Sequence, residues 1–178
     1  MKRSELLKVI LVQNKIELTE REIRVAVYHG VERVIENWLQ GKDYNAKYNR
    51  YEKQFDDSIS GCLGELAFAK FLGAYPEAYS FRDAPDVAGY EVRTIRAASR
   101  NLIVKEYEAK SYRRFVLVFN NCPHFTICGW IATDDPHFNS IAPRIISQGR
   151  EPVYLINKEK LLNFDYEPNY HPEMKRKF

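Results

Sequence analysis

The chain has 178 residues, the length of one compact domain, and its 45% hydrophobic and 29% charged residues exclude a disordered protein. Its net charge of +3 is a weak basic excess, which permits nucleic-acid binding without requiring it. The odd cysteine count argues against a secreted disulfide scaffold, and no apolar stretch reaches the roughly 18 residues of a membrane span. We therefore expect a cytoplasmic protein without a membrane partner.

The first half of the chain is predicted to be helical. Residues 4–17 form the first expected helix. Thr19 and Glu22 make a capping box that begins a second helix, and Gly41 ends it. The apolar face of this helix is expected to contain Ile23, Val27, Val31, Val34, Ile35 and Trp38. Residues 42–55, rich in basic and aromatic side chains, are interpreted as an exposed connection or a short helix. A third helix is predicted over 57–72, with Gly73 and Pro76 after it.

The second half is predicted to be a sheet, because short runs of Val, Ile, Phe and Tyr alternate with turn residues. The expected strands are 85–95, 101–105, 114–120, 125–132 and 152–156, with a helical turn over 158–162. Helices followed by a β-meander indicate an α+β fold with a central sheet. We expect one domain over 1–178, with a helical part at 1–55, a core at 56–165 and a tail at 166–178.

Glu65 is the acidic residue of interest in the third predicted helix. It shares a face with Phe68, Ala69 and Leu72, which are apolar. A carboxylate in an apolar stripe is costly unless it is paired or bound to a metal. Taken alone, Glu65 is better interpreted as a residue at the rim of the core or as the partner of a core arginine.

A second acidic pair is expected in a hairpin. Ala88 and Gly89 suit a two-residue turn, in which Val87 pairs with Tyr90 and Asp86 lies opposite Glu91. Two opposed carboxylates repel each other, and a divalent cation between them would reverse that interaction. The simpler alternative is an exposed hairpin whose polar face happens to contain Asp86, Glu91 and Arg93.

Together these residues resemble the PD-(D/E)XK nuclease superfamily, and the string from Asp86 to Thr94 is similar to small phage-encoded members of it. Glu65 matches the family's helix acid, Pro85-Asp86 its strand dipeptide, and Glu91-Val92-Arg93 its Glu-x-Lys tripeptide. The match covers residues 61–95. The resemblance implies an α/β/α-like fold, with a central mixed sheet, an N-terminal helical segment and a restriction-endonuclease-like core.

The resemblance also implies a metal-dependent endonuclease that hydrolyses DNA with Mg²⁺ or Mn²⁺. Asp86 and Glu91, the carbonyl of Val92, and Glu65 directly or through water are its expected metal ligands, and Arg93 would neutralise transition-state charge. The family usually has Lys at this last position, and Arg cannot act as a base near neutral pH. Lys105, at the end of the next strand, is an alternative ammonium donor.

Basic residues near this site are the expected DNA contacts: Lys47, Arg50, Lys53, Arg96, Arg100 and Lys105. Tyr44, Tyr48 and Tyr51 are candidates for base stacking or for core packing. A homodimer through the N-terminal helices is expected only by analogy with nucleases that cut duplexes.

Two other functions stay open on the sequence alone. The first is a catalytically inactive nuclease-fold protein that binds nucleic acid, with Arg93 as the reason for the lost activity. The second is a small phage factor that binds another protein through its aromatic surface. A zinc site at Cys122, His124 and Cys128 is disfavoured by its spacing and by the missing fourth ligand. The cluster Asp134, Asp135 and His137 is better explained as a turn.

Overall fold

A computed structural model describes residues 14–41, 51–74, 85–146 and 151–164. Its helices are α2 (Glu20–Leu39), α3 (Tyr51–Phe71) and the short α4 (Pro136–Asn139), with 3₁₀ turns η1 (Glu108–Lys110) and η2 (Lys158–Lys160). Its strands are β1 (Lys15–Glu17), β2 (Tyr90–Ile95), β3 (Leu102–Lys105), β4 (Arg114–Asn121), β5 (His124–Ala132) and β6 (Val153–Ile156). The fold is therefore α+β, as predicted.

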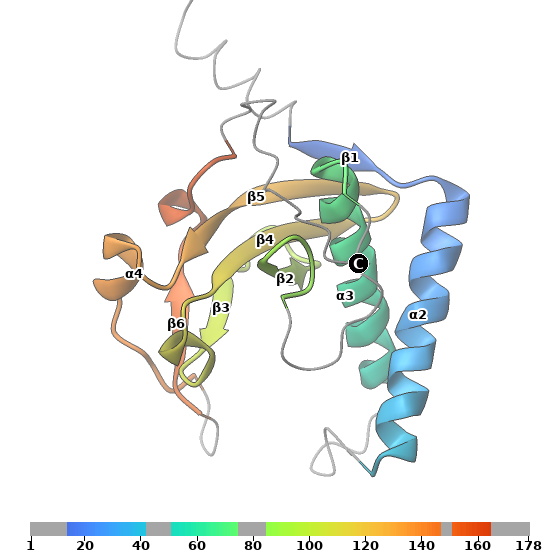
Figure 1. Ribbon diagram of the computed structural model, residues 1–178, viewed down its shortest axis with the longest axis horizontal. Coiled ribbons are helices and arrows are strands. Elements are labelled where there is room, and N and C mark those ends of the chain that lie inside the picture. Colours follow the sequence, from blue (N-terminus) through green and yellow to red (C-terminus); the bar gives the residue numbers. More distant parts are fainter. Residues whose placement is uncertain (1–13, 42–50, 75–84, 147–150, 165–178) are drawn as a thin grey trace, which may run out of the picture.

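The sheet is mixed, and the predicted β-meander is wrong. Four strands follow the order β1-β5-β4-β2, in which β2 and β4 are parallel and the other pairs are antiparallel. β3 leaves this sheet and pairs with β6 in a separate two-stranded sheet. A meander requires each strand to pair with the next strand along the chain. Here β3 follows β2 in sequence but pairs with neither β2 nor β4, which are neighbours in the four-stranded sheet (Figure 1).

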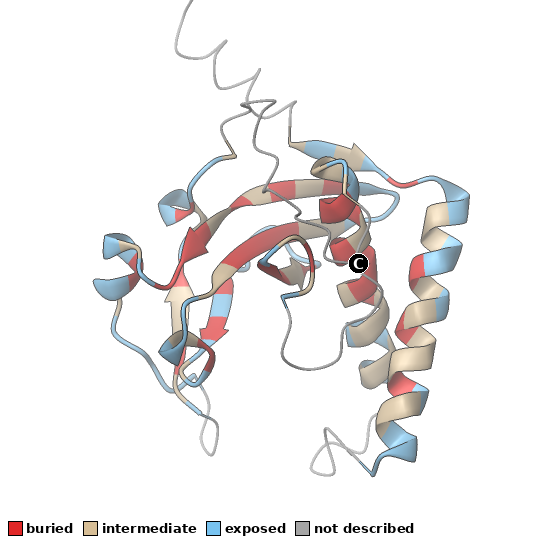
Figure 2. Cartoon of the chain, in the orientation of Figure 1, coloured by how far each residue is buried: buried red, intermediate tan, exposed pale blue. Residues whose placement is uncertain are grey.

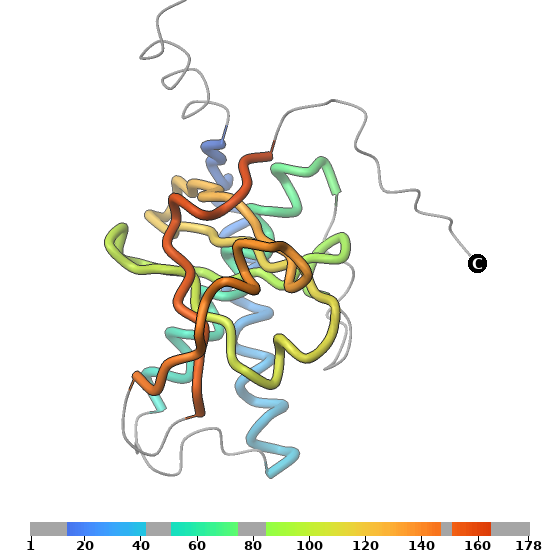
Figure 3. Tube along the Cα trace, turned by 90° about the vertical axis from the view of Figure 1, so that its left-hand side faces the viewer, coloured from blue at the N-terminus to red at the C-terminus, as the bar shows by residue number. Residues whose placement is uncertain are grey.

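The four-stranded sheet has a separate apolar core on each face. α3 packs on one face, over Val92, Val116 and Phe125, and α2 covers α3 from outside (Figure 1). The other face, with Phe115 and Leu117, packs with residues of β3, β6 and α4. Figure 3 shows the molecule from the side of β6 and α4, with α2 at the back. Buried residues follow the middle of β4 and β5 and the inner face of α3 (Figure 2).

The second helix begins and ends as predicted, but its buried face differs. The Thr19 side chain accepts a hydrogen bond from the N–H of Glu22, and the Glu22 carboxylate accepts one from the N–H of Thr19, 2.7 Å away. Gly41 follows the helix at φ +64°. The buried residues are Ala26, Gly30 and Val34. A Cβ on Gly30 would lie 2.6 Å from Cα of Ile59, so this close crossing with α3 selects small residues and leaves Ile35 and Trp38 exposed.

The first and third predicted helices differ from the structure in their bounds. Residues 15–17 of the first predicted helix form the strand β1 beside β5, because sheet pairing overrides a weak local preference. Its residues 4–13 lie outside the described part of the chain. The predicted connection 42–55 contains the first turn of α3, which therefore begins at Tyr51 and not at 57, while 42–50 are outside the described residues. Trp38 packs edge-on against the rings of Tyr51 and Phe55, which supports this extra turn.

Candidate metal centre

The turn before β2 forms as predicted. Val87 and Tyr90 exchange two backbone hydrogen bonds of 3.1 and 2.8 Å, and Ala88 and Gly89 have φ values of +47° and +84°. These are the left-handed conformations that a two-residue hairpin turn requires. The antiparallel pairing stops at this single bridge. The sequence predicted that Asp86 pairs with Glu91 in the next step of this ladder. That prediction is wrong, because no such pair forms.

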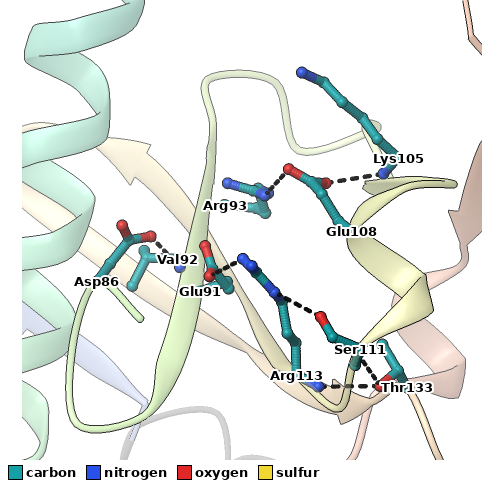
Figure 4. A network of polar contacts seen from close by, with 9 residues as sticks. All are labelled: Asp86, Glu91, Val92, Arg93, Lys105, Glu108, Ser111, Arg113 and Thr133. Carbon is teal, nitrogen blue, oxygen red and sulfur yellow. Dashed lines mark hydrogen bonds and ion pairs between the residues drawn. The ribbon is translucent and has the colours of Figure 1, made fainter. Parts of the chain in front are cut away.

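The carboxylate of Asp86 folds instead onto the outer edge of β2. Its Oδ2 accepts a 2.8 Å hydrogen bond from the backbone N–H of Val92 (Figure 4). β2 is the edge strand of the four-stranded sheet among the described residues, and β4 pairs with its other side. The N–H and C=O groups of one strand residue point to the same side. The Val92 carbonyl thus faces the edge where Asp86 lies.

Strand alternation divides the neighbouring side chains between the two faces of the sheet. Val92 packs in the core beneath α3, and Thr94 lies under Gly64 of α3. Glu91 and Arg93 alternate with them and face the opposite side, where Arg93 lies 5.4 Å from the ring centroid of Phe115. Glu65, on α3, is therefore across β2 from Glu91, and Asp86 at the strand edge lies between them.

The charge of Asp86 interacts with those of Glu65 and Glu91. Its pKa is raised to about 6, first by burial and then by the negative charges of Glu65 and Glu91, against the Val92 hydrogen bond and Arg93, which lower it. Glu65 and Glu91 thus each lie close enough to Asp86 for their charges to act on it, from the two faces of β2. Among the described residues Asp86 forms no ion pair with a basic side chain.

Glu65 is paired with an arginine that the sequence analysis did not select. Two nitrogens of Arg33, on α2, donate to the two carboxylate oxygens of Glu65, each over 3.0 Å. This is the alternative expected for Glu65 taken alone. Burial works against the charge of Arg33, but the hydrogen bonds and charge of Glu65 outweigh it and raise the pKa of Arg33. The pair fixes α2 to α3 and neutralises Glu65 in the metal-free protein.

Glu91 and Arg93 also have partners that the sequence did not reveal. Arg113 donates to Glu91 over 2.6 Å, and Arg93 donates to Glu108 over 2.7 Å (Figure 4). Glu91 and Glu108 are each less than a tenth exposed. Arg113 precedes β4 and Glu108 begins η1, so both approach β2 only because β4 lies parallel beside it. No local pattern in the sequence marks either residue.

The candidate phosphate contacts are spread over the described surface. Lys53 is exposed near the start of α3, and Arg100 is exposed in the turn after β2. Arg96 donates to the Asp56 carboxylate over 3.1 Å and to its carbonyl. The Lys105 side chain extends away from Glu108 and its Nζ lies 3.3 Å from Tyr107 Oη, so it does not take the place of Arg93 (Figure 4). Lys47, Arg50, Tyr44 and Tyr48 lie outside the described residues.

Within the described ranges, no group of three or more His, Cys, Asp or Glu side chains has the arrangement of a ready metal site. This agrees with the position of Glu65 and Glu91 on opposite faces of β2. The described part of the chain also has no helix long and apolar enough to cross a membrane.

Comparison with known proteins adds no assignment. No family model, no curated protein and no solved structure matches this chain.

Proposed function

We propose that this chain is a metal-dependent nuclease that hydrolyses DNA phosphodiester bonds at the open edge of β2, on a restriction-endonuclease-like core. The observation that supports it best is the convergence on Asp86. Glu65 and Glu91, from opposite faces of β2, both raise the pKa of this partly buried carboxylate. Glu65 and Glu91 each hold an arginine, whereas Asp86 has no ion-pair partner among the described residues. A carboxylate left unpaired beside two others is costly, and functional sites are where such arrangements concentrate.

Asp86 and Glu91, with the carbonyl of Val92, are the proposed ligands of Mg²⁺ or Mn²⁺. All three are oxygen donors, and Mg²⁺ needs only one or two carboxylates because water and phosphate oxygens complete its shell. Asp86 is the member without an ion-pair partner among the described side chains. A bound Mg²⁺ would supply Lewis-acid stabilisation of the charge that develops on the scissile phosphate. Glu65, paired with Arg33, is proposed to act on the electrostatics of Asp86 rather than as a direct ligand.

The arginines around Glu91 are proposed to meet the substrate's negative charge. Arg113 is held by Glu91, and its side chain is about one-third exposed, as is that of Arg93. If a cation bound at Glu91 released Arg113, the donors of this guanidinium would become available to a phosphate oxygen. Arg93, oriented by Glu108 and Phe115, contributes positive charge without proton transfer, because a guanidinium stays protonated at neutral pH.

A second function is favoured by the same ion pairs. Glu65 and Glu91 each already hold an arginine, at 3.0 and 2.6 Å, and a metal would have to compete with Arg113 for Glu91. If that competition fails, the chain is a nucleic-acid-binding protein that does not cut. The arginines near β2 then serve for phosphate binding alone.

Cleavage assays separate the two functions. Purified protein is incubated with supercoiled plasmid and with single-stranded circular DNA, in Mg²⁺, in Mn²⁺ and in EDTA. We expect metal-dependent cleavage that Asp86→Asn reduces by about a hundredfold or more, in line with the loss of one transition-state contact. The matched control is Asp134→Asn, an exposed turn residue, which should cut like the wild type.

Each result decides between the two functions. Cleavage that survives Asp86→Asn would point to a contaminant or to another site and contradict this proposal. Salt-sensitive DNA binding without cleavage in any metal would support the inactive binding protein.

A further inference from the structure

The segment from Lys105 to Arg114, which links β3 to β4, combines exposed aromatic rings with basic side chains. It contains four basic and two acidic residues, a local excess of two positive charges in a chain of net charge +3. Tyr107 and Tyr112, on either side of η1, are 53% and 61% exposed. More than half of each tyrosine is therefore open to solvent, where its ring can contact a partner.

Both tyrosine rings are held in place by a cation. Lys105 Nζ lies 5.4 Å from the Tyr107 ring centroid and 3.3 Å from its hydroxyl oxygen. Arg114 lies 5.8 Å from the Tyr112 ring centroid, and its Nε donates to the Tyr112 hydroxyl over 3.0 Å. The same guanidinium is within 6.0 Å of the rings of Tyr90 and Trp130, which fixes it to the sheet.

The segment is also tied to the candidate metal centre. Glu108, inside it, accepts hydrogen bonds from Arg93 on β2 and from the N–H of Lys105. Arg113 binds Glu91 through its side chain, and its N–H donates to Thr133 Oγ1 over 3.0 Å. Figure 4 shows these two ties, Glu108 against Arg93 and Arg113 against Glu91, which hold the segment beside β2.

We propose that Tyr107 and Tyr112 form a stacking surface for single-stranded DNA that leads the strand to the edge of β2. Exposed rings beside fixed positive charges fit a chain of unpaired bases and phosphates, whereas the bases of a duplex are already stacked on one another. The direction of the strand toward the acids rests on the proposed nuclease function. Binding by the tyrosines does not require cleavage.

Fluorescence anisotropy in EDTA tests the surface, with a labelled DNA strand of about 15 nucleotides, its blunt duplex and the RNA strand of the same sequence. We expect the DNA strand to bind tightest. Tyr107→Ala and Tyr112→Ala should each weaken it about tenfold, the loss of one stacked base. Tyr107→Phe and Tyr112→Phe should retain most of the affinity because they keep the ring.

Tyr28→Ala is the matched control, because Tyr28 is also 61% exposed but lies on α2, away from this segment. It should bind like the wild type. Tighter binding of the duplex or of RNA would overturn the proposal, as would unchanged affinity in both alanine variants that remain folded by circular dichroism. Plasmid cleavage that persists in those variants would leave the nuclease standing while this surface fails. Single-strand binding without cleavage would support the surface and contradict the nuclease.

Discussion

The position of Asp86 at the edge of β2 lowers the stability of the metal-free protein. Its carboxylate has an ordinary pKa of 3.8, and in the folded chain burial and the charges of Glu65 and Glu91 raise that pKa to about 6. Between these two values the folded state binds a proton that the unfolded state has already lost. Stability therefore falls as pH rises through this window, and the full cost is present above pH 6.

We predict that Asp86→Asn stabilises the metal-free protein at pH 8 by on the order of 2 kcal/mol, since one pKa unit corresponds to about 1.4 kcal/mol. Asn can still accept the hydrogen bond from Val92. The gain should shrink as the pH falls toward 3, below the ordinary pKa of 3.8, where the wild-type carboxylate is mostly protonated in both states. Urea unfolding of both proteins in EDTA across this range measures the difference. A gain that is constant with pH, or a loss at pH 8, would contradict the raised pKa.

Single residues also show what the sequence could and could not predict. The capping box at Thr19, the turn at Ala88 and Gly89 and the stop at Gly41 all formed as expected, because each depends on a few neighbouring residues. Arg33, Glu108 and Arg113 were missed, because each pairs with an acid through contacts between elements far apart in the chain. The three acids were selected from their positions together with the family resemblance, whereas their ionic partners follow from the topology.

At the scale of elements, the contact of α3 with β2 sets the distance between Glu65 and the strand edge. Gly64 stands directly over Thr94, where an added Cβ would overlap the Thr94 hydroxyl. One turn earlier, Gly61 has room, since a Cβ there would be 3.7 Å from the Glu65 carboxylate. The two glycines lie one turn apart on α3, but only Gly64 is in close contact with β2.

We predict opposite effects of alanine at these two positions. Gly64→Ala should destabilise the protein by roughly 1–3 kcal/mol, because the helix and the strand must separate. Gly61→Ala should be neutral or stabilise by up to about 1 kcal/mol, because alanine favours a helix over glycine. Thermal unfolding of the two variants compares them directly. Equal destabilisation would mean that α3 does not approach β2 at Gly64 in this way.

Strand pairing is the element-scale feature that the sequence predicted least well. The positions of the strands were largely right, but a meander was expected where β2 and β4 are parallel neighbours. Local patterns locate strands and do not specify their partners, because pairing depends on contacts between distant segments. The register shift between Leu117 and Val118 was not expected either: it makes Cys128 an extra residue in β5 and exchanges the two faces of that strand. Its local marker is Gly129, at φ +130°, because a glycine inside a strand often accompanies a bulge.

At the scale of the whole molecule, the four-stranded sheet separates the basic residues at its two edges. β1, with Lys15, forms one edge, and β2, followed by Arg100, forms the other. The proposed site lies at the β2 edge, so the affinity for DNA should depend on the charges at that edge. The predicted homodimer stays a prediction.

We predict that Arg100→Ala weakens DNA binding to a similar degree for unrelated sequences and lowers the salt dependence of affinity by about one phosphate contact. Lys15→Ala, an exposed charge at the opposite edge, should leave both unchanged. Anisotropy titrations at several salt concentrations measure the slopes. The same loss in both variants would indicate binding without a defined side of the molecule.

Manganese binding, followed by electron paramagnetic resonance of free Mn²⁺, tests for a metal centre at Asp86 and Glu91 without any substrate. We expect saturable binding to the wild type that Asp86→Asn and Glu91→Gln each weaken about tenfold or more, with Asp134→Asn unchanged. Binding that is absent, or that is equal in all four proteins, would contradict a metal centre at the edge of β2.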